Sequence, residues 1–343
     1  MPSQNYASNR RNFLRSGLAA AGAATLAPAL LSTQAVAQSN GSGATLPPGD
    51  IAILKFLAAV ELVETDLWTQ YTLLAEHNRG FHRALKNIDP ALVRYNRDIL
   101  RDEKSHADFI NAGLQAVGQA PINLDAFRTL RMPQVQGSNQ AGYITNLTEL
   151  TVDTSWYTKL RSSANPDFGS APVQLVELNG VPAIPPADNL TEDDYQGLAN
   201  VATLHSPSID EAGTSLYAHF LSKVSDVRVV NVLACILPVE AIHFTGFNKA
   251  LENMPGLTVG GVTFPDLRNN PAYARGIFPT PCPFVNTSLP TISVIRPVNS
   301  PNVGAVALVT KLTASGLFKG QSNAFTDAAM MLATAADAAE RAF

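Results

Sequence analysis

Glu103-Lys104-Ser105-His106 and Glu240-Ala241-Ile242-His243 repeat one short pattern, Glu-x-x-His, within a chain of 343 residues. The chain contains only 11 Glu and 6 His. A chance arrangement of these residues gives about 0.2 copies of the pattern, which is the one that dinuclear metal sites in helical bundles use. In a helix, residues three apart lie on one face, about 5–6 Å from each other. Each pair can therefore bind one metal ion if its segment is helical.

Both copies lie in segments with helical periodicity. The first lies in a predicted helix over 89–117, which begins with Asp-Pro and ends before Gly118. The second lies in a predicted helix from 225 or 226 to 252, which a Pro-Gly pair follows. Apolar residues surround the second copy, and a carboxylate is rarely buried in such a segment unless it is paired or bound to a metal.

Two further helices complete a four-helix pattern. An uninterrupted amphipathic segment predicts a helix over 51–77, with Asp50 as its N-cap candidate. Gly80 lies in a short connection, so this helix and the next form an antiparallel hairpin. The helical pattern breaks at Ser206-Pro207, which predicts that the third main helix runs from 208 to about 224.

The remaining candidate ligands are acids on the first and third helices. Glu61 and Glu64 are three residues apart in an apolar stretch of the first helix, and Asp210 and Glu211 open the third. Hairpin geometry brings either member of each pair level, within about one turn, with the Glu-x-x-His motif of the neighbouring helix. For Asp210 and Glu211 the alternative is a dipole role at the helix start.

One acid from each of these helices, added to the two motifs, is the ligand set of dinuclear iron or manganese bundles. Glutamate supplies anionic oxygen that balances the metal charge, and histidine supplies a neutral nitrogen. The alternative is that both motifs are solvent-facing pairs worth a few tenths of a kcal/mol. The sequence therefore predicts a mainly α four-helix bundle with two iron or manganese ions. The candidate ligands are Glu61, Glu64, Glu103, His106, Asp210, Glu211, Glu240 and His243.

Four stretches resemble, in the same order, the helices of the ferritin-like domain found in exported bacterial proteins and plant desiccation-related proteins. They are Phe56–Trp68, Asp102–Phe109, Asp210–Gly213 with Tyr217, and Val239–His243. The resemblance implies a ferritin-like bundle with a dinuclear metal site and a family activity that is mostly undefined. The chain departs from the family at Asp210, where the family tends to have Glu, and at Pro238, which is expected to kink the fourth helix.

Residues 1–37 have the pattern of an export signal. Arg10 and Arg11 precede Phe-Leu, a weakly apolar Ala-rich run follows, and Ala35-Val36-Ala37 is a cleavage motif. The paired arginines resemble the twin-arginine type, which predicts a periplasmic or secreted protein. The alternative is a membrane anchor, but the run is shorter than the roughly 20 apolar residues that a spanning helix needs. We therefore expect no membrane contact after cleavage.

The rest of the chain divides by composition. A Ser/Gly-rich linker is expected over 38–49, the bundle over 50–255 and an extension over 256–343. The bundle is interrupted by a long Pro/Gly-rich insertion over 121–190. Helical pattern returns after it at Thr191, which forms a capping box with the acid three residues on.

Short strands are expected in both of these Pro/Gly-rich regions. Asn179-Gly180 predicts the turn of a small hairpin over 173–184. In the extension, 292–295 and 305–309 are strand candidates, and an Ala-rich helix is expected over 323–342.

Composition excludes several functional classes. The net charge of −4 argues against a nucleic-acid-binding protein. The sequence has no Gly-rich phosphate loop, no Gly-x-Ser-x-Gly elbow and no Cys-x-x-Cys. Metal ions are the expected partners, and an oligomer is compatible with the sequence.

Two functional hypotheses follow from the sequence. The first is a dinuclear iron or manganese oxidoreductase that oxidises Fe(II) or handles dioxygen or peroxide. The second is a desiccation- or stress-related protein that binds metal or has a structural role without turnover. Tyr71 and Tyr217 are either hydrogen-bond donors near the metals or residues of the core.

Overall fold

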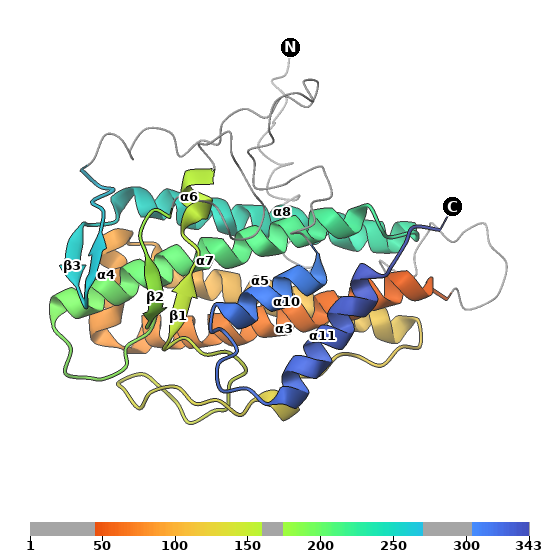
Figure 1. Cartoon of the computed structure of the whole chain (residues 1–343), viewed down its shortest axis with the longest axis horizontal. Coiled ribbons are helices and arrows are strands. Elements are labelled where there is room, and N and C mark those ends of the chain that lie inside the picture. Colours follow the sequence, from red (N-terminus) through yellow and green to blue (C-terminus); the bar gives the residue numbers. More distant parts are fainter. Residues whose placement is uncertain (1–44, 160–173, 270–303, 343) are drawn as a thin grey trace, which may run out of the picture.

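Four long helices lie side by side along the longest axis of the molecule (Figure 1). The computed structural model describes residues 45–159, 174–269 and 304–342, and the predicted export signal lies outside these ranges. The first two long helices pack as one pair and the last two as another. The fold class is mainly α, as predicted. The helices are α3 (Pro48–His77), α5 (Leu92–Ala116), α7 (Glu192–Leu221) and α8 (Val227–Ala250).

Helix α7 is continuous through Pro207, so the predicted start of the third helix at 208 is wrong. Thr191 caps its true start and forms the expected capping box with Asp194. An interior proline costs about 3 kcal/mol because it removes a hydrogen bond and crowds the preceding turn. Almost the whole of α7 is buried, and burial of this kind is the larger contribution to helix stability in proteins.

The segment between α3 and α5 is not a plain connection but the short helix α4 (Arg79–Ile88). Asn78 caps it by accepting a hydrogen bond from the Phe81 amide at 3.0 Å. Gly80 was expected to serve the turn. It instead lets α4 pack closely on α7, because a Cβ at this position would overlap the ring of Tyr195.

Asp50 is not the N-cap of α3, which begins at Pro48. Its buried carboxylate accepts hydrogen bonds from the amides of Ser225 at 2.9 Å and Asp226 at 2.7 Å. Asp226 in turn caps α8 by accepting from the Arg228 amide. Asp50 therefore joins the start of α3 to the turn between α7 and α8.

The described parts of the insertion, 121–159 and 174–190, lie along the bundle, and a buried acid of α3 holds the first of them. Asp66 accepts hydrogen bonds from the amides of Ile144 and Thr145, both at 2.9 Å, and from the Thr145 hydroxyl at 2.7 Å. Arg128 forms an ion pair with the same carboxylate at 2.5 Å. The insertion also contains the short helices η1 (Asp125–Phe127) and α6 (Ser155–Lys159).

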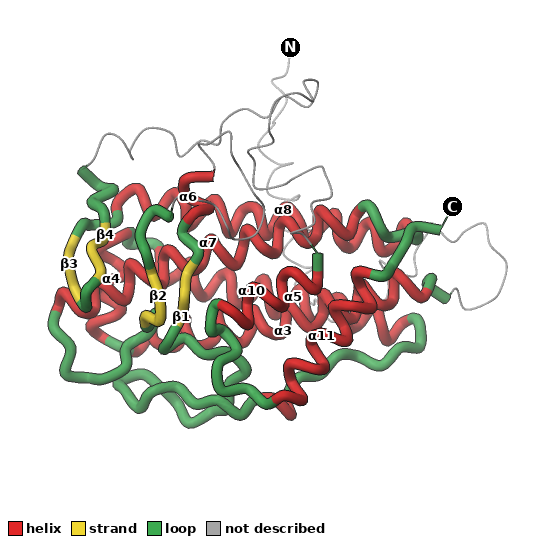
Figure 2. The backbone as a smooth tube through the Cα atoms, viewed as in Figure 1, coloured by secondary structure: helices red, strands yellow, loops and turns green. Residues whose placement is uncertain are grey.

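Strands occupy only short stretches of the described chain (Figure 2). In the insertion, β1 (Leu150–Val152) pairs antiparallel with β2 (Leu178–Val181). The predicted hairpin over 173–184 is wrong, because Asn179 and Gly180 lie within β2 and its partner is 26 or more residues earlier. After η2 (Leu251–Asn253), β3 (Leu257–Val259) and β4 (Val262–Phe264) form a hairpin whose turn consists of two glycines with positive φ.

The C-terminal extension contributes α10 (Ala305–Ala314) and α11 (Asn323–Asp337). The strand predicted over 305–309 is therefore wrong, whereas the terminal helix is present and ends five residues earlier than expected. Asp337 explains the helix at 305, because its carboxylate accepts from the amides of Ala305 at 2.8 Å and Val306 at 2.9 Å. The other strand candidate, 292–295, lies outside the described residues. Helix α11 packs against α3.

The core consists of two apolar clusters with a polar layer between them. Along α5 the change from one cluster to the other falls between Ile99 and Ile110, and along α8 between Ile236 and Phe244. On α7 the change falls between Ile209 and Ala212. The polar layer therefore crosses the bundle at one level, and the acids and histidines occupy it.

Among the described residues, one helical stretch, Val227–Asn253, is long and apolar enough to cross a membrane, with a mean hydropathy of 1.7 over its most apolar part. A helix of a protein core meets the same criterion. Here α8 places Glu240 and His243, both buried, in the polar layer.

Candidate metal centre

The polar layer brings six of the eight candidate ligands into two adjoining groups. The first group has one ligand atom from each member within 4.8 Å of the others and consists of Glu61, Glu103, His106 and Glu240. The second group meets the same limit and consists of Asp210, Glu240 and His243. Every member is buried. Glu240 belongs to both groups, so the two positions share a carboxylate.

Glu103, a member of the first group, also contacts a histidine of the second group. Its Oε2 lies 3.1 Å from His106 Nδ1, and its Oε1 lies 2.9 Å from His243 Nδ1. The second contact is close enough for an ion pair, but it is not aligned as a hydrogen bond. The ring centroids of the two histidines are 6.5 Å apart. Two carboxylates therefore lie between two imidazoles.

His106 presents one ring nitrogen to three carboxylates. Its Nδ1 lies 3.2 Å from Glu61 Oε2, 3.1 Å from Glu103 Oε2 and 3.5 Å from Glu240 Oε1. An imidazole nitrogen carries at most one hydrogen, so it cannot bond to all three oxygens in line. Converging oxygens and a nitrogen are instead the donor set of a cation such as iron, manganese or zinc.

Unsatisfied polar atoms test whether this donor set fits a metal. Within the described parts of the chain, six atoms of the two groups are buried without a hydrogen-bond partner: Glu103 Oε1, His243 Nδ1 and both carboxylate oxygens of Asp210 and of Glu240. Burying polar or charged atoms unpaired costs several kcal/mol. Bound cations would satisfy these atoms, so the residues fit a buried metal site.

The pKa values show how the centre balances its charge without a metal. Burial raises the pKa of Glu61 to about 8, although His106 opposes the shift. Burial and the neighbouring carboxylates also raise the pKa of Asp210 and of Glu240. Burial opposes ionisation of Glu103 too, but its close contacts with the two histidines lower its pKa to about 2.

The histidines hold protons in the same balance. Burial alone would lower the pKa of His243, but Asp102 and Glu103 raise it to about 11. The pKa of His106 rises in the same way, because three glutamates outweigh its burial. Imidazolium charges thus occupy the place that metal charge would take, and a metal must displace these protons to bind.

Two neighbouring side chains position the ligands. The Tyr217 hydroxyl donates a hydrogen bond to Glu61 Oε1, so of its two predicted roles Tyr217 has the donor role. Asp102 Oδ2 lies 3.1 Å from Nε2 of His243, which leaves Nδ1 facing the layer. In the described structure Tyr71 contacts none of these ligands, and its hydroxyl oxygen lies 2.8 Å from His205 Nδ1. Sequence reasoning missed Asp102, although its position directly before the first motif was a signal.

Gly213 is a second residue that the sequence did not single out as part of the site. A Cβ at this position would lie 2.7 Å from Glu240 Oε2. A glycine in the middle of a helix costs about 0.5–1 kcal/mol relative to alanine. On α7 it allows the shared carboxylate to approach the helix closely.

The other two candidates lie outside both groups. Glu64 is buried on α3 one turn beyond Glu61, and it lines an apolar cavity. Glu211 is buried on α7 next to Asp210. Because α7 starts at 192, Asp210 and Glu211 are in mid-helix, and the alternative of a dipole role at a helix start is wrong. The structure thus distinguishes the two members of each pair, because their side chains leave the helix in different directions around its axis.

Comparison with known proteins gives one match. A family model described as ferritin-like domain matches residues 49–253, which include all four long helices and the insertion. No curated protein matches the chain, and no solved structure does.

Proposed function

The chain belongs to the ferritin-like domain family, and from this premise we propose that it is an exported protein with a dinuclear iron or manganese centre. Its proposed activity is redox chemistry on Fe(II), dioxygen or peroxide. The observation that carries the proposal is the pair of buried groups that share Glu240, with six polar atoms left unsatisfied. A surface role for the two motifs would not require this burial.

The ligands of the two ions follow from the two groups. Glu61 and His106 would hold one ion, and Asp210 and His243 would hold the other. Glu103 and Glu240 lie between them and would contact both. Iron or manganese bound there would supply a change of oxidation state, which none of the side chains can supply.

The protein's own residues would control protons and water at the centre. Tyr217 holds Glu61 in place through its hydroxyl, and Asp102 orients the ring of His243. The full burial of Glu103 and Glu240 keeps bulk water from the shared carboxylates. Positioned neighbours of this kind commonly change metal affinity by about 10–100-fold.

Metal analysis of the purified protein tests the centre. We expect about two transition-metal ions per chain, as in other dinuclear carboxylate bundles. The double variant Glu103→Gln with Glu240→Gln should lose most of this metal while keeping its helical content. Glu149→Gln with Glu192→Gln is the matched control, because it removes the same charge from two exposed positions. Equal metal content in both double variants would contradict the assignment.

Turnover separates the two functional hypotheses. Oxygen consumption by the metal-loaded protein after addition of Fe(II) supports the oxidoreductase. A protein that holds two ions and consumes no oxygen or peroxide is instead the metal-binding or desiccation-related alternative.

Export by the twin-arginine route is a separate part of the proposal, supported by the sequence of residues 1–37. Arg10→Lys with Arg11→Lys should leave the unprocessed chain in the cytoplasm. Cell fractionation and N-terminal sequencing check this, and a mature chain that still begins near Gln38 outside the cytoplasm would contradict the route.

A further inference from the structure

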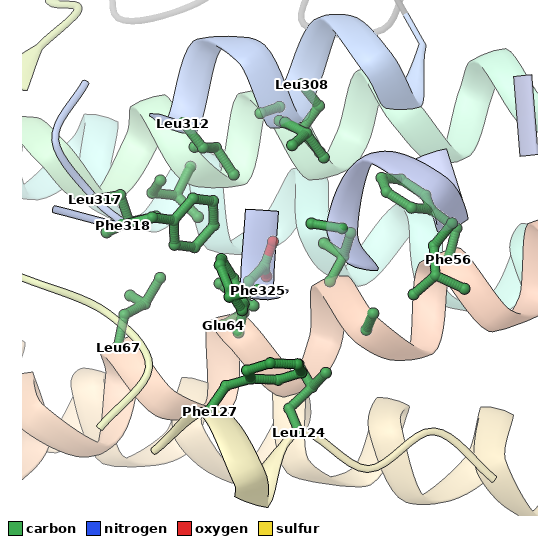
Figure 3. Close-up of a pocket in the computed structure, with 18 of the residues that line it drawn as sticks. Phe56, Glu64, Leu67, Leu124, Phe127, Leu308, Leu312, Leu317, Phe318 and Phe325 are labelled. Atoms are coloured by element: carbon green, nitrogen blue, oxygen red, sulfur yellow. The ribbon is translucent and has the colours of Figure 1, made fainter. Parts of the chain in front are cut away.

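An apolar cavity lies beside the centre, between the bundle and the C-terminal extension. Figure 3 shows Leu308 and Leu312 of α10 at the top, Phe325 of α11 beside Glu64 of α3 in the middle, and Leu124 and Phe127 at the bottom. The cavity measures about 60 Å³. At roughly 10–15 Å³ for each water-sized sphere, this is room for about four to six of them in line or clustered.

Glu64 is the single ionisable residue among those that line the cavity. It is 5% exposed, and within the described parts of the chain its Oε2 has no hydrogen-bond partner. Glu61, one turn earlier on α3, is a member of the first group. Gly213, which borders the shared carboxylate of Glu240, lines the same cavity. The cavity therefore lies next to the candidate metal centre, with Gly213 between the cavity and Glu240.

The walls determine what can occupy this space. Apart from Glu64 the lining consists of aliphatic and aromatic side chains and small residues such as Ala212 and Ala329. A hydrated cation or a charged metabolite would lose its water here with Glu64 as its one charged partner, which costs several kcal/mol or more. A dry apolar cavity instead takes up apolar molecules, and at about 60 Å³ this one suits a gas-sized molecule such as xenon.

We propose that this cavity binds a small uncharged apolar gas such as dioxygen next to the candidate metal centre. Its role as the substrate position rests on the proposed function, but the binding itself does not. The insertion and the extension form the outer walls of the cavity.

Ligand binding to the metal-free protein tests the cavity independently of the centre. Xenon, followed by ¹²⁹Xe chemical shift, probes a gas-sized apolar space. It should bind the wild-type protein. Ala329→Leu fills the cavity from α11 and should abolish this binding. The control is Ala335→Leu, which adds the same atoms at an exposed position of the same helix.

The outcomes distinguish the two proposals. Binding of xenon that is lost in Ala329→Leu and kept in Ala335→Leu supports the cavity even if the protein holds no metal. Absence of binding to the wild-type protein, or unchanged binding to Ala329→Leu, overturns it. If Ala329→Leu does not fold, Ala328→Leu fills the same space. In the metal-loaded protein, Ala329→Leu should reduce oxygen consumption without reducing metal content, which a loss of the centre would not do.

Discussion

Glu240 shows at the scale of single residues how the centre is built. Its two oxygens are buried without hydrogen bonds in the described structure, between two histidines that carry raised pKa values. Gly213 makes room for one of these oxygens. A ligand position in this protein thus depends on a neighbour that has no side chain.

Replacement of Gly213 by alanine should separate metal binding from stability. The new Cβ would displace the Glu240 carboxylate, and the affinity for metal should fall by about 10–100-fold, as for other disturbances of ligand position. The metal-free protein should be as stable or more stable, by up to about 1 kcal/mol, because alanine favours the helix. Calorimetric titration with Mn(II) and urea unfolding measure the two effects. A parallel loss of both would show a packing defect instead.

The pKa of Glu61 predicts how pH acts on the metal-free protein. Glu61 titrates near 4.5 when unfolded and at about 8 when folded, so the folded state binds more protons between these values. The contribution of Glu61 to the free energy of unfolding is therefore highest below about pH 4.5. It falls as pH rises towards 8, by on the order of a few kcal/mol. His243, whose pKa is raised to about 11, acts in the same direction above its ordinary value.

Unfolding at pH 5.5 and pH 8 checks this prediction. The metal-free wild-type protein should unfold more easily at pH 8, and Glu61→Gln should reduce the difference. Metal binding should strengthen over the same range, because fewer protons must be displaced. A metal-free protein that gains stability between these two pH values would contradict the raised pKa of Glu61.

At the scale of elements, the contacts between segments depend on buried acids as much as on apolar faces. Asp50 joins α3 to the turn before α8, and Asp66 holds the insertion against α3. Asp337 caps α10 from the end of α11. In each case one carboxylate satisfies amides that are distant in the sequence, which fixes the segment where the cavity and centre need it.

Asp66→Asn should therefore loosen the insertion. The amide keeps one acceptor oxygen, loses the ion pair with Arg128 and places an NH₂ group against donors of Ile144 and Thr145. We expect a loss of about 1–3 kcal/mol in the free energy of unfolding. Asp125→Asn is the control, because Asp125 also pairs with Arg128 but is exposed, and its loss should be within about 0.5 kcal/mol. Hydrogen exchange at 144 and 145 would report the local effect.

For the whole molecule, a metal bound in the polar layer would be linked to folding. Binding to the folded state alone stabilises it by about 2.7 kcal/mol at a hundredfold excess over Kd. For a domain of this size that corresponds to a rise of roughly 5–10 °C in the melting temperature. Glu103→Gln with Glu240→Gln should abolish this rise. Scanning calorimetry with and without Mn(II) measures it, and a full metal-induced rise in the double variant would place the metal elsewhere.

The sequence alone determined the four long helices and the level at which their acids and histidines meet. Helical period and chain reversal are local properties, so Glu103 and His106, and likewise Glu240 and His243, had to share helix faces. The family resemblance agrees with the match over 49–253. The errors were of another kind, and they include Asp50, Asn179-Gly180, Pro207 and 305, where a local signal opposed a contact made far along the chain.

Only the tertiary structure decided which member of each acid pair joins the two buried groups and what surrounds it. The side chains of nearby residues on a helix point in different directions around its axis. Which of them faces the other helices depends on how each helix is rotated about its axis in the packed bundle. That rotation places Glu61 and Asp210 in the groups and leaves Glu64 facing the apolar cavity. The cavity itself exists because two regions without a long periodic pattern fold back on the bundle, held by single carboxylates such as Asp66 and Asp337 whose partners lie many residues away.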